Sequence, residues 1–221
     1  MSWTIERHGR VAVVTMTTNP VNAQNRAFFA DLHETFDRLE RDHAESPVVL
    51  TGTGARFSAG EPVAVADWFQ AYRATNLRLF TYPRPTVAAV NGHAFAGGLI
   101  TAAVCDHRVA VADGSARFGL NEVPIGIPMP AVYVRMLAHA WGDPVATRTC
   151  LLGEIFTPDQ ALALGMVYAF TKRACQAAPL RDIAELADPL DTGLPAGMTS
   201  EQARHAHRRY WQELKGRPAE W

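Results

Sequence analysis

The chain has 221 residues, of which 48% are hydrophobic and 19% are charged, and its formal net charge is −1. This length and composition favour a globular domain with a substantial core, and the balanced charge argues against a nucleic acid as the main partner. No apolar run approaches the ~20 residues of a membrane span, and the N-terminal residues lack the apolar core of a signal peptide.

The cysteines indicate a reducing environment. Cys105, Cys150 and Cys175 are widely spaced and odd in number, which favours free thiols and a cytoplasmic location. Cys105 and Cys150 lie in apolar runs, so we expect both to be packed in the core.

Strands and helices alternate along the first half of the chain. β-branched and aliphatic runs predict strands, and apolar residues at helical spacing predict helices. The expected strands are 10–16, 47–51, 85–90 and 107–112, and the expected helices are 24–42, 63–80 and 97–105. This alternation is typical of parallel strands joined by helical crossovers, so we predict an α/β fold.

The second half is mostly helical. Asp143 and Pro144 have the pattern of an N-cap followed by the first helical residue. Thr157-Pro158-Asp159-Gln160 has the pattern of a capping box, and Gly165 is placed to end that helix. A polar, basic helix is expected over 199–214, either folded back on the domain or packed on a neighbouring subunit.

A glycine-rich segment, Gly92–Gly98, lies between the strand 85–90 and the helix 97–105. We interpret it as a turn into a helix start, where unpaired backbone N–H groups and the helix dipole stabilise negative charge. Close packing of helix on strand would also require glycine, for shape alone.

Common motifs for phosphate and for nucleophilic serine do not fit. Gly92–Gly97 has the spacing of a P-loop, but Gly98-Leu99 stands where Lys-Ser/Thr is required. The dinucleotide fingerprint lacks its third glycine after Gly52-Thr53-Gly54. A serine hydrolase built on Ser58 is not favoured either, because the G-x-S-x-G elbow is absent and no histidine can be assigned as its base.

Four segments in order carry a family resemblance. They are Asn19-Pro20-Val21-Asn22-Ala23, Gly54-Ala55-Arg56-Phe57-Ser58-Ala59-Gly60, Val90-Asn91-Gly92-His93-Ala94-Phe95-Ala96-Gly97-Gly98 and Phe118-Gly119-Leu120-Asn121-Glu122-Val123-Pro124-Ile125-Gly126-Ile127. Over about residues 1–170 the chain resembles the crotonase family of enoyl-CoA hydratases and isomerases. Phe156-Thr157-Pro158 through Gly165-Met166-Val167 adds a fifth match, and Gly119-Leu120-Asn121-Glu122 is most similar to the Δ3,Δ2-enoyl-CoA isomerase branch.

The resemblance implies a crotonase-like spiral of ββα repeats over residues 1–167 and a helical C-terminal trimerisation or capping segment over 168–221. It implies a homotrimer or a dimer of trimers, acting on an acyl-CoA thioester in fatty-acid metabolism such as β-oxidation. No cofactor is implied beyond the coenzyme A of the substrate. No metal is expected, since His205 and His207 are two residues apart and do not share a helix face.

Matched residue by residue, the resemblance implies that the Gly97 backbone N–H holds the thioester oxygen and that Glu122 is the acid/base. The second backbone donor belongs to the residue after Ser58-Ala59-Gly60. The implied substrate-binding positions are Val21, Ala23, Ser58, Ala59, Gly60 and Ile100. Removing a proton alpha to a thioester puts negative charge on its oxygen, so preorganised donors there lower the barrier by roughly several kcal/mol.

The sequence neighbours of Glu122 are compatible with either an exposed or a buried carboxylate. Its apolar neighbours in the sequence are compatible with a solvated loop glutamate or with a carboxylate in an apolar pocket, where its pKa would rise toward neutrality.

Ile100 is a departure from the family pattern that argues against hydration. Hydratases of this family use two glutamates, and the first would fall at Ile100, which cannot transfer a proton. One carboxylate suffices for a 1,3-proton shift, and an apolar residue there would help to exclude water. We therefore predict isomerisation of 3-enoyl-CoA to 2-enoyl-CoA by Glu122. A hydratase, another thioester-enolate enzyme and a catalytically silent acyl-CoA-binding subunit are the alternatives.

Two junctions are shorter than the resemblance implies. Family members have a longer loop after the position of Gly60, and a strand and a helix after that of Val167. We hypothesise that this sequence lacks residues at both places, in which case Glu61 is not the second donor.

The other polar residues near these segments have simpler interpretations. We expect His93 and Asp106 to be structural. Arg26, Arg56 and Arg84 are expected to be surface charges, although each could reach a phosphate of coenzyme A.

Overall fold

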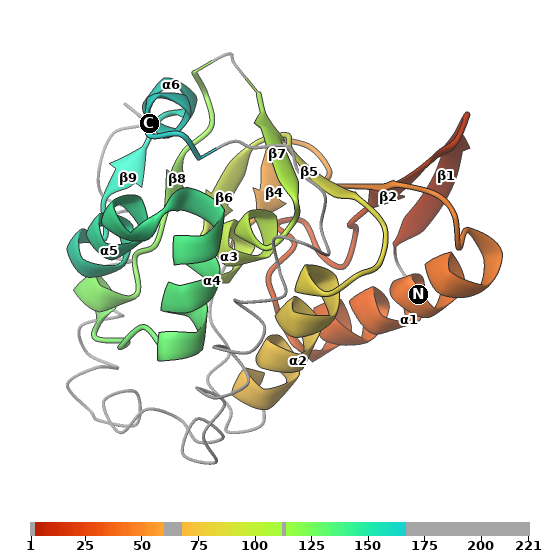
Figure 1. Ribbon diagram of the computed structural model, residues 1–221, viewed down its shortest axis with the longest axis horizontal. Helices are drawn as coiled ribbons and strands as arrows, with labels where there is room; N and C mark the ends of the chain where they lie inside the picture. Colours follow the sequence, from red (N-terminus) through yellow and green to blue (C-terminus); the bar gives the residue numbers. More distant parts are fainter. Residues whose placement is uncertain (1–2, 60–67, 112–113, 167–221) are drawn as a thin grey trace.

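The computed structural model describes residues 3–59, 68–111 and 114–166 (Figure 1). Within these ranges the chain forms two sheets with helices packed against them, so the predicted α/β class is confirmed. No helix in these ranges has the length and the apolar character needed to cross a membrane.

The larger sheet contains the four predicted strands and one that the sequence did not indicate. Its strands are β1 (Thr4–His8), β2 (Val11–Thr15), β3 (Val48–Thr51), β5 (Thr86–Val90) and β7 (His107–Ala110), in the spatial order β1-β2-β3-β5-β7. β2, β3, β5 and β7 are parallel, and β1 pairs antiparallel with β2. β1 escaped prediction because it is an edge strand in which only Ile5 is partly buried.

The smaller sheet consists of short strands that carry no periodic signal. They are β4 (Arg56–Ser58), β6 (His93–Phe95), β8 (Phe118–Gly119) and β9 (Ile155–Phe156), in the order β4-β6-β8-β9. β6 corrects the prediction for Gly92–Gly98. This segment is not a single turn, because His93–Phe95 pairs in parallel with both β4 and β8 before α3 begins.

The two longest helices come first in the chain. They are α1 (Arg26–Asp42), α2 (Trp68–Phe80), α3 (Gly97–Ala103), the 3-10 turn η1 (Val123–Ile125), α4 (Ala131–Trp141), α5 (Asp143–Leu152) and α6 (Pro158–Ala163). The capping box of α6 is confirmed, with Thr157 and Gln160 bonded in both directions. The start of α5 was predicted wrongly. Asp143 is its first residue, and Gly142 takes the N-cap position with φ +81°.

The chain passes alternately through the two sheets. β3, β4 and α2 form one repeat, β5, β6 and α3 form the next, and β7 and β8 begin another. This confirms the predicted spiral of ββα repeats (Figure 1). As a result, α3 begins at the end of β6, and the turn that contains Glu122 follows β8, its neighbour in the smaller sheet. The segment 168–221, where the C-terminal helices were predicted, lies outside the described residues.

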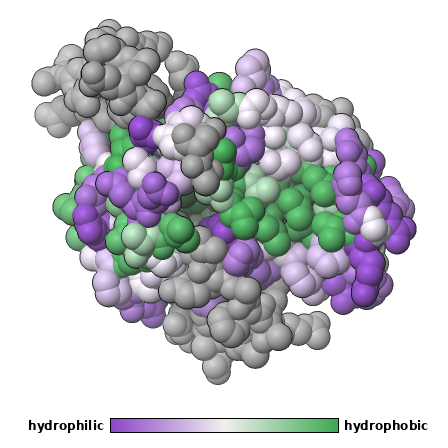
Figure 2. Space-filling model, turned by 90° about the horizontal axis from the view of Figure 1, so that it is seen from above, coloured by the Kyte–Doolittle hydropathy of each residue, from purple (hydrophilic) through white to green (hydrophobic). Residues whose placement is uncertain are grey.

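One face of the larger sheet packs into the core against the helices. Ala12, Leu50 and Ala88 from the strands join Phe28 and Phe36 of α1 in one buried cluster. The opposite face is less covered, with Val109 48% exposed. Figure 2 looks down on the molecule from the top of Figure 1 and shows a broad hydrophobic area bordered by polar residues.

The structure confirms several packing predictions. Cys105 and Cys150 are buried and are not disulfide-bonded. Asp106 is structural, because its Oδ2 accepts from the backbone N–H of Thr86 at 2.7 Å and from the Thr86 hydroxyl at 3.0 Å. Arg84 is a surface residue whose side chain bonds to Glu45 and to the Ala44 carbonyl oxygen.

Candidate active site

The start of α3 presents backbone donors. Ala96 precedes it with φ +49° and ψ −124°, a conformation that is uncommon for a residue with a side chain. The Ala96 carbonyl oxygen accepts from the N–H groups of Leu99 at 3.0 Å and Ile100 at 3.1 Å. The first two N–H groups of the helix, those of Gly97 and Gly98, remain as N-terminal donors for which the helix offers no acceptor.

Both glycines at this point are closely approached by other segments. A Cβ atom on Gly98 would lie 2.1 Å from the carbonyl oxygen of Ser58 in β4. A Cβ atom on Gly97 would lie 2.6 Å from Oε1 of Gln24 and 3.3 Å from the ring of Tyr72. The glycines therefore let α3 begin in contact with β4 and with the loop that precedes α1.

The end of β4 is tied to that loop. The N–H of Ala59 donates to the carbonyl oxygen of Val21 at 2.9 Å, and the hydroxyl of Ser58 donates to that of Asn22 at 2.8 Å. The buried Ser58 hydroxyl is thus bonded to backbone, which gives no support to a nucleophilic role. Gly60 and Glu61 lie outside the described residues, so the junction at which we hypothesise missing residues lies outside them as well.

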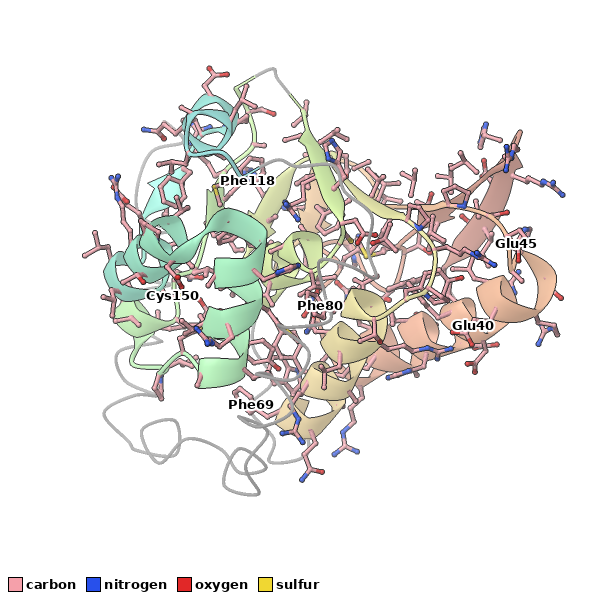
Figure 3. The ribbon with its side chains drawn as sticks, in the orientation of Figure 1. Glu40, Glu45, Phe69, Phe80, Phe118 and Cys150 are labelled. Atoms are coloured by element: carbon pink, nitrogen blue, oxygen red, sulfur yellow. The ribbon has the colours of Figure 1, made fainter. Side chains whose placement is uncertain are left out.

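Glu122 enters the site from the turn after β8. It is 9% exposed, and its carbonyl oxygen accepts from the N–H groups of Ile125 and Ile127 at 3.1 and 2.9 Å, which fixes its backbone. Its Oε2 has no hydrogen-bond partner within the described residues. Figure 3 labels Phe118 on β8, the strand that leads into this turn, and Cys150 on α5, which packs against η1.

Burial changes the acid–base chemistry of Glu122. Loss of hydration raises the pKa of this carboxyl from 4.5 to about 7, against a smaller opposing contribution from a backbone hydrogen bond. Of the two environments that the sequence allows, the structure has the buried one. A carboxyl with a pKa near 7 can both accept and release a proton at neutral pH.

Tyr72 connects Glu122 with the start of α3. Its ring packs against Gly97, and its hydroxyl lies 3.4 Å from the Gly97 carbonyl oxygen. Burial raises the pKa of Tyr72 well above its usual value, and the charges of Tyr133 and Glu122 raise it further. The N–H of Ala96 also donates to the carbonyl oxygen of Gly119 at 2.9 Å, so the turn that carries Glu122 is joined to the start of α3.

Aromatic side chains line this region. Tyr72 stacks on Trp68 with ring centroids 4.7 Å apart, and Tyr133 of α4 lies 5.0 Å from Tyr72. Sequence reasoning treated Tyr72 and Trp68 only as apolar positions of a helix and did not single out Tyr133 or Gln24. Gln24 and Tyr72 adjoin Gly97, and Trp68 and Tyr133 pack on Tyr72. These contacts arise where the loop before α1 meets α2, α3 and α4, which leaves no signal in local spacing.

The remaining residues that the sequence singled out lie on α3, in the loop before α1, on β6 or outside the described residues. Ile100 is buried at 2% exposure on the first turns of α3, and Val21 and Ala23 are half-buried in the loop before α1. His93 is structural as expected, since its Nδ1 accepts from the N–H of Arg117 at 3.1 Å. His205 and His207 lie outside the described residues.

Sequence comparison identifies the family. The model of the enoyl-CoA hydratase/isomerase family matches residues 6–188. The chain belongs to this family. It is 37% identical over 180 residues to a putative enoyl-CoA hydratase of Thermus thermophilus, covering 72% of this chain and 67% of that protein. It is 32% identical over 167 residues to the mitochondrial enoyl-CoA delta isomerase 1 of Mus musculus, covering 71% and 58%.

Solved structures agree with the family assignment. The human mitochondrial Δ3,Δ2-enoyl-CoA isomerase superposes with a TM-score of 0.73 at 26% identity, over 97% of this chain and 98% of that one. An enoyl-CoA hydratase of Thermoplasma volcanium gives 0.67 at 25% identity, over 99% and 94%. The crotonase fold is therefore confirmed, while the relatives divide between isomerases and hydratases. The matches to the two sequence relatives above span only 58–67% of their lengths.

Proposed function

We propose that this family member isomerises 3-enoyl-CoA to 2-enoyl-CoA by a 1,3-proton shift. The observation that carries the proposal is Glu122, a buried carboxyl with a pKa of about 7 and an oxygen that has no partner within the described residues, on a turn that the Ala96–Gly119 backbone bond joins to the start of α3. Such a carboxyl suits a reaction in which one group takes a proton from one carbon and returns it to another.

The proposed reaction has two steps. Glu122 removes a proton from C2 of the 3-enoyl-CoA, and the electron pair of that C–H bond delocalises onto the thioester oxygen as a dienolate. The pair then returns through the conjugated system, C4 takes the proton back from Glu122, and the double bond lies between C2 and C3. The same carboxyl is regenerated, so no co-reactant is consumed.

The backbone donors would stabilise the dienolate. The N–H of Gly97 supplies one hydrogen bond to the thioester oxygen, and the second donor that the family resemblance implies after Ser58-Ala59-Gly60 supplies the other. Ala59 is not that donor, because its own N–H is bonded to Val21. Donors that are fixed before the substrate arrives need no reorganisation as charge develops, which lowers the barrier by roughly 3 kcal/mol for each donor.

Ile100 favours isomerisation over hydration. It is buried on the first turns of α3, at the position where the family resemblance places the first glutamate of a hydratase. With an isoleucine there, Glu122 is the single carboxyl proposed to act on the substrate. Water addition needs a group that orients water, and an aliphatic side chain offers none.

Hydration is the second candidate, because the 37% identical relative in Thermus thermophilus carries the name of a putative enoyl-CoA hydratase. The deciding experiment supplies the purified chain with 3-enoyl-CoA and, separately, with 2-enoyl-CoA. We expect conversion of the first and no water addition to the second. Hydration at a comparable rate would favour the second candidate.

The matched variant is Glu122→Gln, which keeps the shape of the side chain and removes its proton chemistry. We expect it to bind acyl-CoA as the wild type does and to lose isomerisation. Binding of acyl-CoA by the wild type without any turnover would instead indicate a catalytically silent subunit. Isomerisation that survives the substitution would reject Glu122 as the base.

We further propose the homotrimer, or dimer of trimers, that the family resemblance implies, with residues 168–221 in subunit contacts. Light scattering on the full chain tests the assembly, and a monomer would contradict it.

Val21 and Ala23 are proposed to face the coenzyme A portion of the substrate, on the support of the motif match alone. A cytoplasmic location, in fatty-acid metabolism, likewise stays a prediction.

A further inference from the structure

The loop before α1 is held in shape by its own hydrogen bonds. The side-chain oxygen of Asn19 accepts from the N–H groups of Val21 at 3.2 Å and Ala23 at 2.9 Å, and its amide nitrogen donates to the Ala23 carbonyl oxygen at 3.2 Å. Asn22, with φ +49°, completes the turn by donating its N–H to the Asn19 carbonyl oxygen at 3.0 Å. The loop therefore acts as a rigid unit.

One side of this loop is bonded to the end of β4. Besides the bonds from Ser58 and Ala59, the side-chain amide of Asn22 donates to the carbonyl oxygen of Phe57 at 3.2 Å. Three hydrogen bonds thus fix the strand end that precedes the proposed second donor.

The other side of the loop is bonded to α3 through a single buried side chain. Gln24 is 8% exposed, and its Nε2 donates to the hydroxyl of Thr101 at 2.9 Å. Thr101 lies one turn after Gly97 on α3 and is fully buried. The same loop is therefore attached to both segments proposed to supply donors for the thioester oxygen.

The direction of these bonds is determined by the next residues in the chain of hydrogen bonds. Asn76 donates from Nδ2 to the carbonyl oxygen of Tyr72 at 2.9 Å, so its Oδ1 faces Thr101. The hydroxyl of Thr101 donates to that oxygen at 3.1 Å and can then only accept from Gln24. The Oε1 of Gln24 is consequently turned toward Gly97, where it has no hydrogen-bond partner within the described residues.

From this arrangement we infer that Gln24 is a positioning residue, which sets the position of the Gly97 N–H relative to the end of β4 at Ser58 and Ala59. The inference rests on the proposed function. Gln24 acts from both ends of its amide: Nε2 holds α3 through Thr101, and Oε1 limits how closely Gly97 can approach the loop. It does not contact the reacting atoms, but acts on them through the two donors.

A small change in this distance would affect the reaction more than binding. Donors aimed at a developing charge lose effect when displaced, and a shift of roughly 1 Å can cost about a hundredfold in rate. The proposed contacts of Val21 and Ala23 with the coenzyme A portion would be kept, because the Asn19 side chain holds this part of the loop independently of Gln24. Loss of the Gln24–Thr101 bond should therefore lower kcat while leaving KM nearly constant.

The test compares Gln24→Leu, Thr101→Val and the double variant with wild type in 3-enoyl-CoA isomerisation. We expect each single variant to lower kcat about tenfold to a hundredfold, with the double variant no slower than the slower single one. Thr101→Ser, which keeps the hydroxyl, should restore kcat. Thr51→Val is the matched control, because the Thr51 hydroxyl also joins two elements by bonding to the Ala89 carbonyl oxygen at 2.9 Å.

A second readout separates failure of this inference from failure of the proposed function. Exchange of the C2 proton of a saturated acyl-CoA in deuterated water requires the base and the donors but no double-bond shift. A wild type that exchanges without isomerising rejects the isomerase proposal, and the variants are then compared by exchange rate. Folded Gln24→Leu protein with wild-type kcat and exchange, or a control variant that slows equally, would overturn the positioning role. A wild type with neither reaction would overturn both proposals.

Discussion

The backbone N–H of Ala96 donates to the carbonyl oxygen of Gly119 at 2.9 Å, and this bond joins the two halves of the candidate site. Ala96 immediately precedes the donor at Gly97, and Gly119 stands three residues before Glu122. The bond continues the parallel pairing of β6 with β8. The position of the carboxyl relative to the donors is therefore set by a backbone ladder rather than by side-chain packing.

The first prediction concerns stability and pH. The carboxyl of Glu122 titrates at about pH 7 in the folded state and near 4.5 when unfolded. Between these values the folded state binds more protons than the unfolded state, so the free energy of unfolding decreases as pH rises and then levels off above about 7. The total loss attributable to Glu122 is roughly 3 kcal/mol.

Urea unfolding of wild type and Glu122→Gln at a series of pH values measures this contribution, because other titrating groups cancel in the difference. The variant should gain stability relative to wild type as pH rises through this window. A difference that does not vary with pH would show that Glu122 is solvated.

The second prediction concerns the rate. If ionised Glu122 is the base, kcat/KM for 3-enoyl-CoA should rise with pH and reach a plateau above an apparent pKa of about 7. Steady-state assays across this range, with the chain checked for folding at each pH, provide the profile. A rate already at its maximum near pH 5 would contradict a base with a raised pKa.

The third prediction compares two adjacent glycines. In Gly98→Ala the new methyl group would meet the backbone of Ser58, which cannot move without displacing β4, so we expect a loss of stability of about 1–3 kcal/mol. In Gly97→Ala the methyl group meets the end of the Gln24 side chain, which can give way, so stability should fall less than in Gly98→Ala.

The two glycine variants should also differ in function. Gly97→Ala displaces Gln24 and the proposed donor, so we expect kcat to fall even though the protein folds. Urea unfolding together with isomerase assays on both variants tests this. Equal stability losses, or full activity of Gly97→Ala, would contradict the geometry.

The fourth prediction concerns Arg108, a buried side chain that holds backbone carbonyl groups. Its Nη1 donates to the carbonyl oxygens of Ala103 and Cys105, at the end of α3, and its Nε donates to that of Met166. Arg108→Met leaves these acceptors without their donors, which should cost roughly 3 kcal/mol or more in unfolding free energy.

Arg148→Met is the control for Arg108. Arg148 forms an exposed pair with Glu154, and pairs of this kind contribute little to stability. Chemical denaturation of both variants under identical conditions gives the comparison. Comparable losses from the two substitutions would show that the buried hydrogen bonds of Arg108 are not what stabilises this region.

Local sequence patterns predicted the regular elements of the larger sheet because its central strands are buried and rich in β-branched residues. The second sheet could not be predicted in this way. Strands of two or three residues, such as β8, have no period to detect and exist only because β6 and β9 pair with them. The single turn predicted for Gly92–Gly98 was wrong for the same reason.

The sequence by itself determined the family, the candidate roles of Gly97 and Glu122, and the significance of an isoleucine at position 100, since these depend on the identity and order of residues in short motifs. The burial of Glu122, its raised pKa and the packing of Tyr133 on Tyr72 were decided only by the tertiary structure. So was the attachment of Gln24 to Thr101, which lies 77 residues away in the chain. These features arise when α2 and α4 pack on α3 and α5 packs on η1, and no local pattern encodes which distant side chains then remove a carboxyl from water.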